Sequence, residues 1–149
     1  MKLCVIGTGY VGLVAGAGFA EFGNTVICCD IDERKIDMLN RGEIPIYEPG
    51  LKTLVDRNAE KGRLVFTTDI ASGVKDAEAV FMAVGTPMGD DGRADLRALW
   101  AAGETVAKAL TGFAVIVDKS TVPVGTAENL EAHMRKFTDV DFTVASNPE

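Results

Sequence analysis

The residues whose spacing most clearly points to chemistry are three glycines near the start of the chain. Residues 7–12 read Gly-Thr-Gly-Tyr-Val-Gly, the pattern G-x-G-x-x-G, directly after a short apolar run and at the start of a helical one. Gly7 would permit a tight turn, Gly9 would let a pyrophosphate approach the backbone, and Gly12 would let the helix press against the strand. Free amides at the helix N-terminus attract phosphate. The motif therefore predicts a dinucleotide site, and the alternative is a glycine turn that holds no ligand.

The next residue that bears on the choice of cofactor is a carboxylate, Asp30, which follows the glycine motif. Asp30 ends the next apolar run, Thr25–Cys29, 18 positions after Gly12. A carboxylate there accepts hydrogen bonds from ribose hydroxyls and repels a 2′-phosphate, which favours NAD over NADP. Arg34 and Lys35 follow closely, and a basic side chain could instead accommodate that phosphate. The plainer alternatives are that Asp30 only ends a strand and that Lys35 is an exposed helical residue.

Two turns with hydroxyl side chains come after later apolar runs. Gly85-Thr86-Pro87 follows the fourth expected strand, and Ser120-Thr121 follows the fifth. In a doubly wound sheet, ligands bind outside the carboxyl ends of the strands. We therefore expect Thr86 and Thr121 to face the same crevice as the glycine turn. Without that placement they would be ordinary turn residues.

These residues are positioned by a chain that alternates apolar runs with helical stretches. Strands are expected at Lys2–Ile6, Thr25–Cys29, Leu64–Thr67, Ala79–Val84, Ala114–Val117 and Phe142–Ala145. Helices are expected at Tyr10–Phe22, from an Asp32 cap to Asn40, at Leu51–Lys61, from an Asp95 cap to about Leu110, and at Thr126–Phe137. The alternation predicts an α/β fold. We expect a Rossmann-type doubly wound parallel sheet of about six strands with helices on both faces, in one domain.

Composition narrows the classes of partner. The chain has 149 residues, 47% of them hydrophobic, with 15 Lys plus Arg against 22 Asp plus Glu and a net charge of −7. Such an acidic chain is a poor binder of nucleic acid, although backbone amides can still hold a small anion. No apolar run reaches the roughly 18 residues of a membrane span, and no signal peptide is evident, so a cytoplasmic location is expected.

The few cysteines and the single histidine argue against a metal site or a cysteine nucleophile. Cys4, Cys28 and Cys29 fall in expected core strands and are therefore interpreted as inert buried thiols. His133 lies in a polar helical stretch and is expected to be a solvated surface residue. We expect no metal site.

Six segments together resemble the UDP-glucose/GDP-mannose dehydrogenase family of nucleotide-sugar dehydrogenases. They are the glycine motif, Pro-Ile-Tyr-Glu-Pro-Gly-Leu at 45–51, Val-Gly-Thr-Pro at 84–87, Asp91-Gly92 with Asp95-Leu96, Lys-Ser-Thr-Val-Pro-Val-Gly-Thr at 119–126, and Asn-Pro-Glu at 147–149. The likeness runs in order over essentially the whole chain. It implies that residues 1–149 are the N-terminal NAD-binding Rossmann domain of a longer enzyme. The central helical and C-terminal substrate domains of such an enzyme would lie outside this chain.

The resemblance also implies an activity. Enzymes of this kind oxidise the C6 alcohol of a nucleotide sugar to a carboxylate with two NAD⁺ in succession, through a thioester on a cysteine. UDP-glucose, giving UDP-glucuronate, is the expected substrate. The alternatives are GDP-mannose or a UDP-N-acetyl sugar, or a stand-alone NAD-binding regulatory module. The family's nucleophilic cysteine lies outside this chain, so the chain alone is expected to be inactive.

The family motifs assign roles to individual residues. The residues implied to bind NAD are Gly7, Gly9, Tyr10, Val11, Gly12, Asp30, Lys35, Thr86 and Thr121. Thr121 would also position a catalytic water. Glu149 would lie at the substrate and take part in proton transfer or thioester hydrolysis, whereas by itself a glutamate at that place would be interpreted as exposed. The resemblance further implies a homo-oligomeric full-length enzyme.

Overall fold

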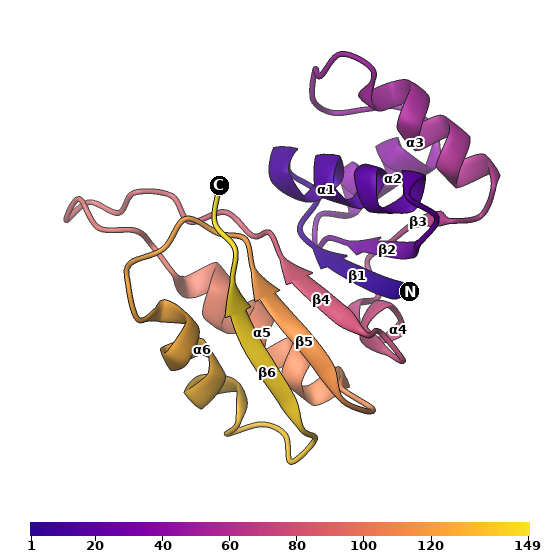
Figure 1. Ribbon diagram of the computed structural model, residues 1–149. Coiled ribbons are helices and arrows are strands. Elements are labelled where there is room, and N and C mark those ends of the chain that lie inside the picture. Colours follow the sequence, from indigo (N-terminus) through magenta and orange to yellow (C-terminus); the bar gives the residue numbers. More distant parts are fainter.

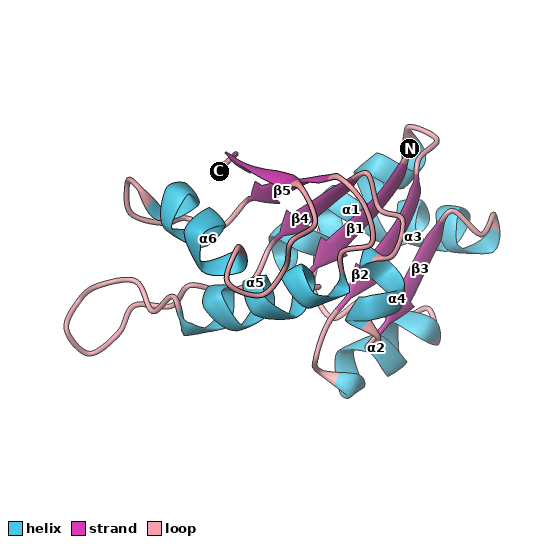
Figure 2. Ribbon diagram, turned by 90° about the horizontal axis from the view of Figure 1, so that it is seen from below, coloured by secondary structure: helices cyan, strands magenta, loops and turns pink.

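Six parallel strands form one sheet with helices on both faces, as the alternating pattern predicted (Figures 1 and 2). The computed structural model describes residues 1–149. The strands are β1 (Lys2–Ile6), β2 (Thr25–Cys29), β3 (Leu64–Thr67), β4 (Ala79–Met82), β5 (Ala114–Asp118) and β6 (Phe142–Ser146). They lie in the order β3-β2-β1-β4-β5-β6, and each neighbouring pair is parallel. The predicted doubly wound fold is confirmed.

Six helices cover the sheet in two groups. They are α1 (Tyr10–Glu21), α2 (Glu33–Asn40), α3 (Leu51–Glu60), α4 (Ile70–Val74), α5 (Arg97–Ala109) and α6 (Thr126–Met134). Residues of α1–α3 pack with Leu3 and Val5 in one core, and residues of α4–α6 pack with Cys4 and Ile6 in another. Successive side chains of a strand point to opposite faces. A strand with a core on each side therefore needs a continuous apolar run, which β1 has.

The order of the strands creates the position for a site. From β1 the chain builds outward through β2 and β3, and then crosses back to place β4 on the other side of β1. Chain connections therefore diverge at the carboxyl ends of β1 and β4, and this divergence leaves a crevice. In Figure 1, the C-terminal end of the chain lies at the same edge as the carboxyl ends of β4–β6.

Some boundaries differ from the sequence prediction for local reasons. The side chain of Asp32 accepts a hydrogen bond from the Arg34 amide and caps α2, as predicted. Asp95 is not the cap of α5. The helix begins at Arg97 after Leu96, and Asp95 accepts hydrogen bonds from the Arg97 amide and guanidinium instead.

Helix α4 is absent from the sequence prediction. It is only five residues long, so it has too few turns to show a helical period. The Asp69 side chain, which accepts a hydrogen bond from the Ser72 amide, is the local signal that marks its start.

The three cysteines are free and fully buried, as predicted. A hydrogen bond with Cys29, together with burial, raises the pKa of Cys4, and burial raises the pKa of Cys28. A thiol held protonated in the core is a poor nucleophile. None of the helices has both the length and the apolar composition to cross a membrane.

Candidate functional site

The three glycines of the motif meet three different spatial requirements. Gly7 follows β1 with φ +103°, and a side chain there would press on the carbonyl oxygen of Ala83. A Cβ on Gly12 would overlap the carbonyl oxygen of Gly7, so the first turn of α1 lies directly against the loop. A Cβ on Gly9 would meet no atom within 4 Å. Gly7 and Gly12 thus allow close packing, whereas Gly9 faces open space that a ligand can occupy.

The N-terminus of α1 is left free for an anion. Gly9 is its N-cap residue, no side chain caps the helix, and its first turn contains no acidic residue. The first amides of a helix have no partner within the helix, and the helix dipole places partial positive charge beside them. Together with the open space at Gly9, these amides fit the pyrophosphate of a dinucleotide.

Asp30 is a half-buried carboxylate held by the glycine turn itself. The amide and the hydroxyl of Thr8 both donate to its Oδ2 at 2.8 Å, and the Asp32 amide donates to Oδ1 at 2.9 Å. Burial alone would favour the protonated form, but these hydrogen bonds and the charge of Lys35 outweigh it and lower the pKa of Asp30. The carboxylate is therefore fixed and ionised.

Two hollows adjoin along the carboxyl edge of the sheet. The first hollow has a volume of about 540 Å³ and lies between the glycine turn, the end of β2, the end of β4 and one side of α5. Its lining is largely apolar and includes Gly7, Gly9, Asp30 and Lys35. Arg34 is not part of it, because its guanidinium is exposed and pairs with Asp32 at 3.7 Å. Lys35 is thus the one basic residue in the lining of this hollow.

The second hollow has a volume of about 310 Å³ and shares Gly9 and residues 83–85 with the first. It is lined further by Tyr10, Val11, Thr86, Lys119, Ser120, Thr121 and Glu149. The Thr86 hydroxyl donates to the Thr121 carbonyl oxygen at 3.0 Å, and the Ser120 hydroxyl donates to the Val84 carbonyl oxygen at 2.9 Å. These bonds tie the turns after β4 and β5 together. The structure therefore places Thr86 and Thr121 at one crevice with the glycine turn.

Of the residues that the family motifs assign to NAD or substrate, only Gly12 lines neither hollow. It lies under the turn, where it permits the contact with Gly7. The structure adds two residues that sequence reasoning missed, Thr8 and Lys119. Thr8 occupies a variable position of the glycine motif, and Lys119 comes directly after an apolar strand. Neither position carries a sequence signal for its burial or its partners.

Charged and hydroxyl groups from distant segments meet around the second hollow. Lys119 is 9% exposed, and its Nζ lies 3.1 Å from Asn147 Oδ1 and 3.3 Å from Glu149 Oε1. The Tyr10 hydroxyl, which also belongs to the lining, donates to Glu48 Oε2 at 2.9 Å. That hydrogen bond to Glu48 is the main cause of the raised pKa of Tyr10, and the charge of Glu149 adds to it. Glu149 thus shares the lining of this hollow with a cation, Lys119, and a phenol, Tyr10.

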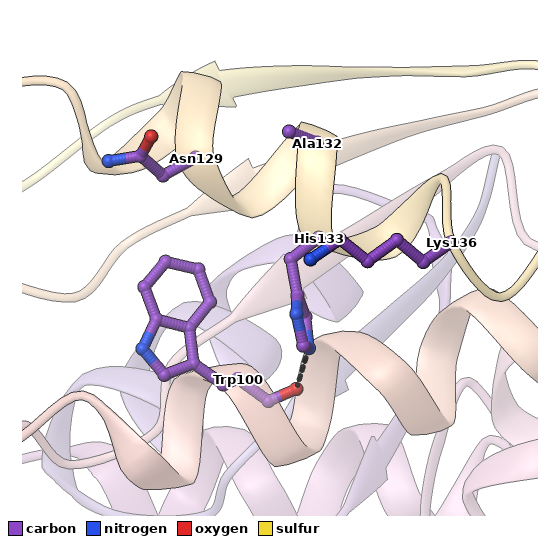
Figure 3. A pocket seen from close by; sticks show the side chains of 5 residues that line it. All are labelled: Trp100, Asn129, Ala132, His133 and Lys136. Atoms are coloured by element: carbon purple, nitrogen blue, oxygen red, sulfur yellow. Dashed lines mark hydrogen bonds between the residues drawn. The ribbon is translucent and has the colours of Figure 1, made fainter.

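A third depression lies apart from this edge, between α5 and α6 (Figure 3). It has a volume of about 430 Å³ and shares no residue with the other two hollows. His133 is half-buried there, with Nε2 3.2 Å from the Trp100 carbonyl oxygen and its ring between those of Trp100 and Phe137. The expectation of a solvated surface histidine is therefore wrong, because α5 packs against this side of α6. No group of three metal-ligating side chains forms in the structure.

Comparisons with known proteins assign the chain to a protein family. Residues 1–149 match the NAD binding domain of the UDP-glucose/GDP-mannose dehydrogenase family. The chain is 53% identical to UDP-glucose 6-dehydrogenase TuaD of Bacillus subtilis, over 99% of this chain and 32% of that protein. It is 52% identical to UDP-glucose 6-dehydrogenase of Rhizobium meliloti, over 100% of this chain and 35% of that protein. The chain spans about a third of the length of these relatives.

Solved structures agree with the fold. A UDP-glucose dehydrogenase from Pyrobaculum islandicum superposes with a TM-score of 0.94 at 41% identity, over 99% of this chain and 35% of that one. A ternary complex of GDP-mannose dehydrogenase from Pseudomonas aeruginosa superposes with a TM-score of 0.91 at 36% identity, over 100% of this chain and 36% of that one.

Proposed function

Because the chain belongs to the UDP-glucose/GDP-mannose dehydrogenase family and is its NAD-binding domain, we propose that it forms the cofactor half of a UDP-glucose 6-dehydrogenase. In this proposal the longer polypeptide oxidises the C6 alcohol of UDP-glucose to the carboxylate of UDP-glucuronate. One observation carries the choice of substrate. Three curated relatives more than 50% identical to the chain are all UDP-glucose 6-dehydrogenases, whereas the GDP-mannose enzyme is 36% and a UDP-N-acetyl-mannosamine enzyme 29% identical.

The first hollow would hold the adenosine side of the cofactor. The free amides at the start of α1 would bind the pyrophosphate beside Gly9. Asp30, held by Thr8, would accept hydrogen bonds from the ribose hydroxyls, and its charge would oppose a 2′-phosphate. Lys35 lines the same hollow and would add a donor. When bound, NAD⁺ supplies the acceptor for the hydride that leaves the sugar.

The second hollow would hold the reacting groups. Thr121 would orient a water molecule with its hydroxyl, and Thr86 would support that turn through its bond to the Thr121 carbonyl oxygen. Glu149 is ionisable, lines the same hollow and has a 60% exposed side chain, so it can exchange a proton with water or substrate. A carboxylate that accepts the proton of the water assists thioester hydrolysis.

We propose that the remainder of the longer polypeptide closes the second hollow. Ligand sites usually bury most of the surface of a small molecule. Residues 1–149 provide one wall, so the cysteine nucleophile and most contacts to the nucleotide sugar belong to the other wall. A homo-oligomeric enzyme and a cytoplasmic location, both expected from the sequence, remain part of this proposal.

The experiment compares residues 1–149 with the longer polypeptide that contains them. NAD binding is measured by calorimetry, and NADH formation is followed with UDP-glucose, GDP-mannose and UDP-N-acetyl sugars. We expect both proteins to bind NAD and only the longer one to form NADH, with UDP-glucose preferred and two NADH released per sugar. Preference for another nucleotide sugar would change the substrate. NAD binding with no NADH from any of them would point to a regulatory module.

A further inference from the structure

Lys119 is a buried cation in the wall of the second hollow. Its side chain is 9% exposed, and lysine is rarely buried without a partner for its charge. The Nζ atom has two partners, Asn147 Oδ1 at 3.1 Å and Glu149 Oε1 at 3.3 Å. Both partners lie in the segment that follows β6. The ammonium therefore links the end of β5 to residues 147–149, the segment that contains Glu149.

The backbone fixes where this ammonium lies. The Lys119 amide donates to the Met82 carbonyl oxygen at 2.9 Å, and the Asn147 amide donates to the Asp118 carbonyl oxygen at 2.8 Å. These bonds extend the β4–β5 and β5–β6 pairings by one step at their carboxyl ends. With its backbone anchored and its head group bound to Asn147, the lysine has lost most of its rotamer freedom before it meets Glu149.

Glu149 depends on this contact. The ion pair with Lys119 is the single hydrogen bond or ion pair that its side chain makes, and the side chain is otherwise 60% exposed. Neither Tyr10 nor Asp118 forms a hydrogen bond with Glu149. The Tyr10 hydroxyl, on α1, donates to Glu48 from the loop before α3. Asp118, next to Lys119 in the chain, accepts from the Ser120 amide with Oδ1, while its buried Oδ2 has no hydrogen-bond partner.

We propose that Lys119 is a positioning residue that holds the Glu149 carboxylate in the wall of the second hollow. This inference rests on the proposed proton-transferring role of Glu149. An exposed ion pair contributes little because two mobile side chains must be ordered and water screens their charges. Here the lysine is already ordered and shielded, so only the glutamate loses freedom. Lys119 therefore fixes the position of the Glu149 carboxylate.

A double-mutant cycle in the longer polypeptide tests whether Lys119 acts through Glu149. The variants are Lys119→Met, Glu149→Gln and the two combined, with kcat measured under saturating UDP-glucose and NAD⁺. Glu149→Gln should lower kcat by about a hundredfold or more, as for loss of a general acid or base. Lys119→Met should lower it by about tenfold, through misplacement of the carboxylate. The double variant should be no slower than Glu149→Gln alone, within about twofold.

Two further variants separate positioning from a loss of structure. Lys119→Arg keeps the charge and should recover most of the activity that Lys119→Met loses. Lys108→Met removes an exposed lysine that pairs with Glu104 at 2.6 Å, and it should leave kcat at the wild-type value. If Lys119→Met does not fold, Lys119→Gln, which can still bond to Asn147, replaces it in the cycle.

The outcomes distinguish this inference from the function on which it rests. Wild-type turnover in Glu149→Gln would remove Glu149 from the mechanism, and the role of Lys119 with it. A second result would leave the proposed function intact but overturn the positioning role. In that result Glu149→Gln is slow, and the double variant is slower still by the full factor that Lys119→Met loses on its own. That result, with a raised KM for UDP-glucose, would mean that Lys119 contacts the substrate directly.

Discussion

Substitutions at Gly9 and Gly12 should separate cofactor binding from stability within a single turn. The two glycines are three residues apart in the same motif, but their surroundings are opposite. A Cβ on Gly12 would overlap the Gly7 carbonyl oxygen, whereas a Cβ on Gly9 would meet nothing within 4 Å. Gly9 also has φ −71° and ψ −168°, an extended conformation that valine adopts without strain.

The expected magnitudes follow from these contacts. Gly12→Ala forces backbone atoms apart, and overpacking of this kind costs about 1–3 kcal/mol. For a domain of this size, each kcal/mol lowers Tm by about 2–4 °C. Gly9→Val replaces a glycine at the N-cap of α1, so it should lower the free energy of unfolding by only about 1 kcal/mol. Its side chain would occupy the space proposed for the pyrophosphate, and NAD affinity should fall at least about a hundredfold, or 2.7 kcal/mol.

Calorimetric titration with NAD and urea unfolding measure the two effects on the same samples. Gly18→Ala is the matched control, because Gly18 lies in the same helix and an added Cβ there has no neighbour within 4 Å. This substitution should weaken neither NAD binding nor the stability of the fold. A folded Gly9→Val protein that binds NAD as tightly as the wild type would refute the placement of the pyrophosphate. A Gly12→Ala protein as stable as the wild type would refute the close contact between α1 and the turn.

Three other outcomes concern Asp30, Thr8 and Thr121. The wild type should bind NAD at least about tenfold more tightly than NADP, or 1.4 kcal/mol, and Asp30→Ala should narrow that gap in calorimetric titrations; equal affinities in the wild type would contradict the role of the carboxylate. Because the folded pKa of Asp30 is lowered, its stabilising effect is present above about pH 4 and is lost as the pH falls through the lower folded value. Urea midpoints measured against pH should show this loss of stability. Thr8→Val, which removes the donor hydroxyl, should make the dependence of the midpoint on pH smaller and should lower the free energy of unfolding by about 1 kcal/mol at neutral pH. Thr121→Ala should lower kcat of the longer enzyme more than it weakens NAD binding, and an equal loss in both would limit Thr121 to cofactor contact.

The sequence predicted the fold because its signals are local and repeat along the chain. Apolar runs such as Lys2–Ile6 and Ala114–Val117 are bounded by glycine or polar residues, and they alternate with helical stretches. Once the strands are known to be parallel, their carboxyl ends must share an edge, so Thr86 and Thr121 could be placed with the glycine turn. The boundaries of α4 and α5 could not be obtained in this way, because a few local hydrogen bonds decide where a short helix begins.

What the sequence determined by itself is the type of each functional group and the strand that precedes it: glycines after β1, a carboxylate after β2, hydroxyls after β4 and β5. Only the tertiary structure decided which groups touch. Thr8 and Asp30 are 22 positions apart, and Lys119 and Asn147 are 28 apart, yet each pair is in hydrogen-bond contact. Such contacts depend on strand register and on how deeply packing buries a side chain. The whole sheet sets burial and register, because the position of each strand depends on its hydrogen-bonded pairing with the adjacent strands.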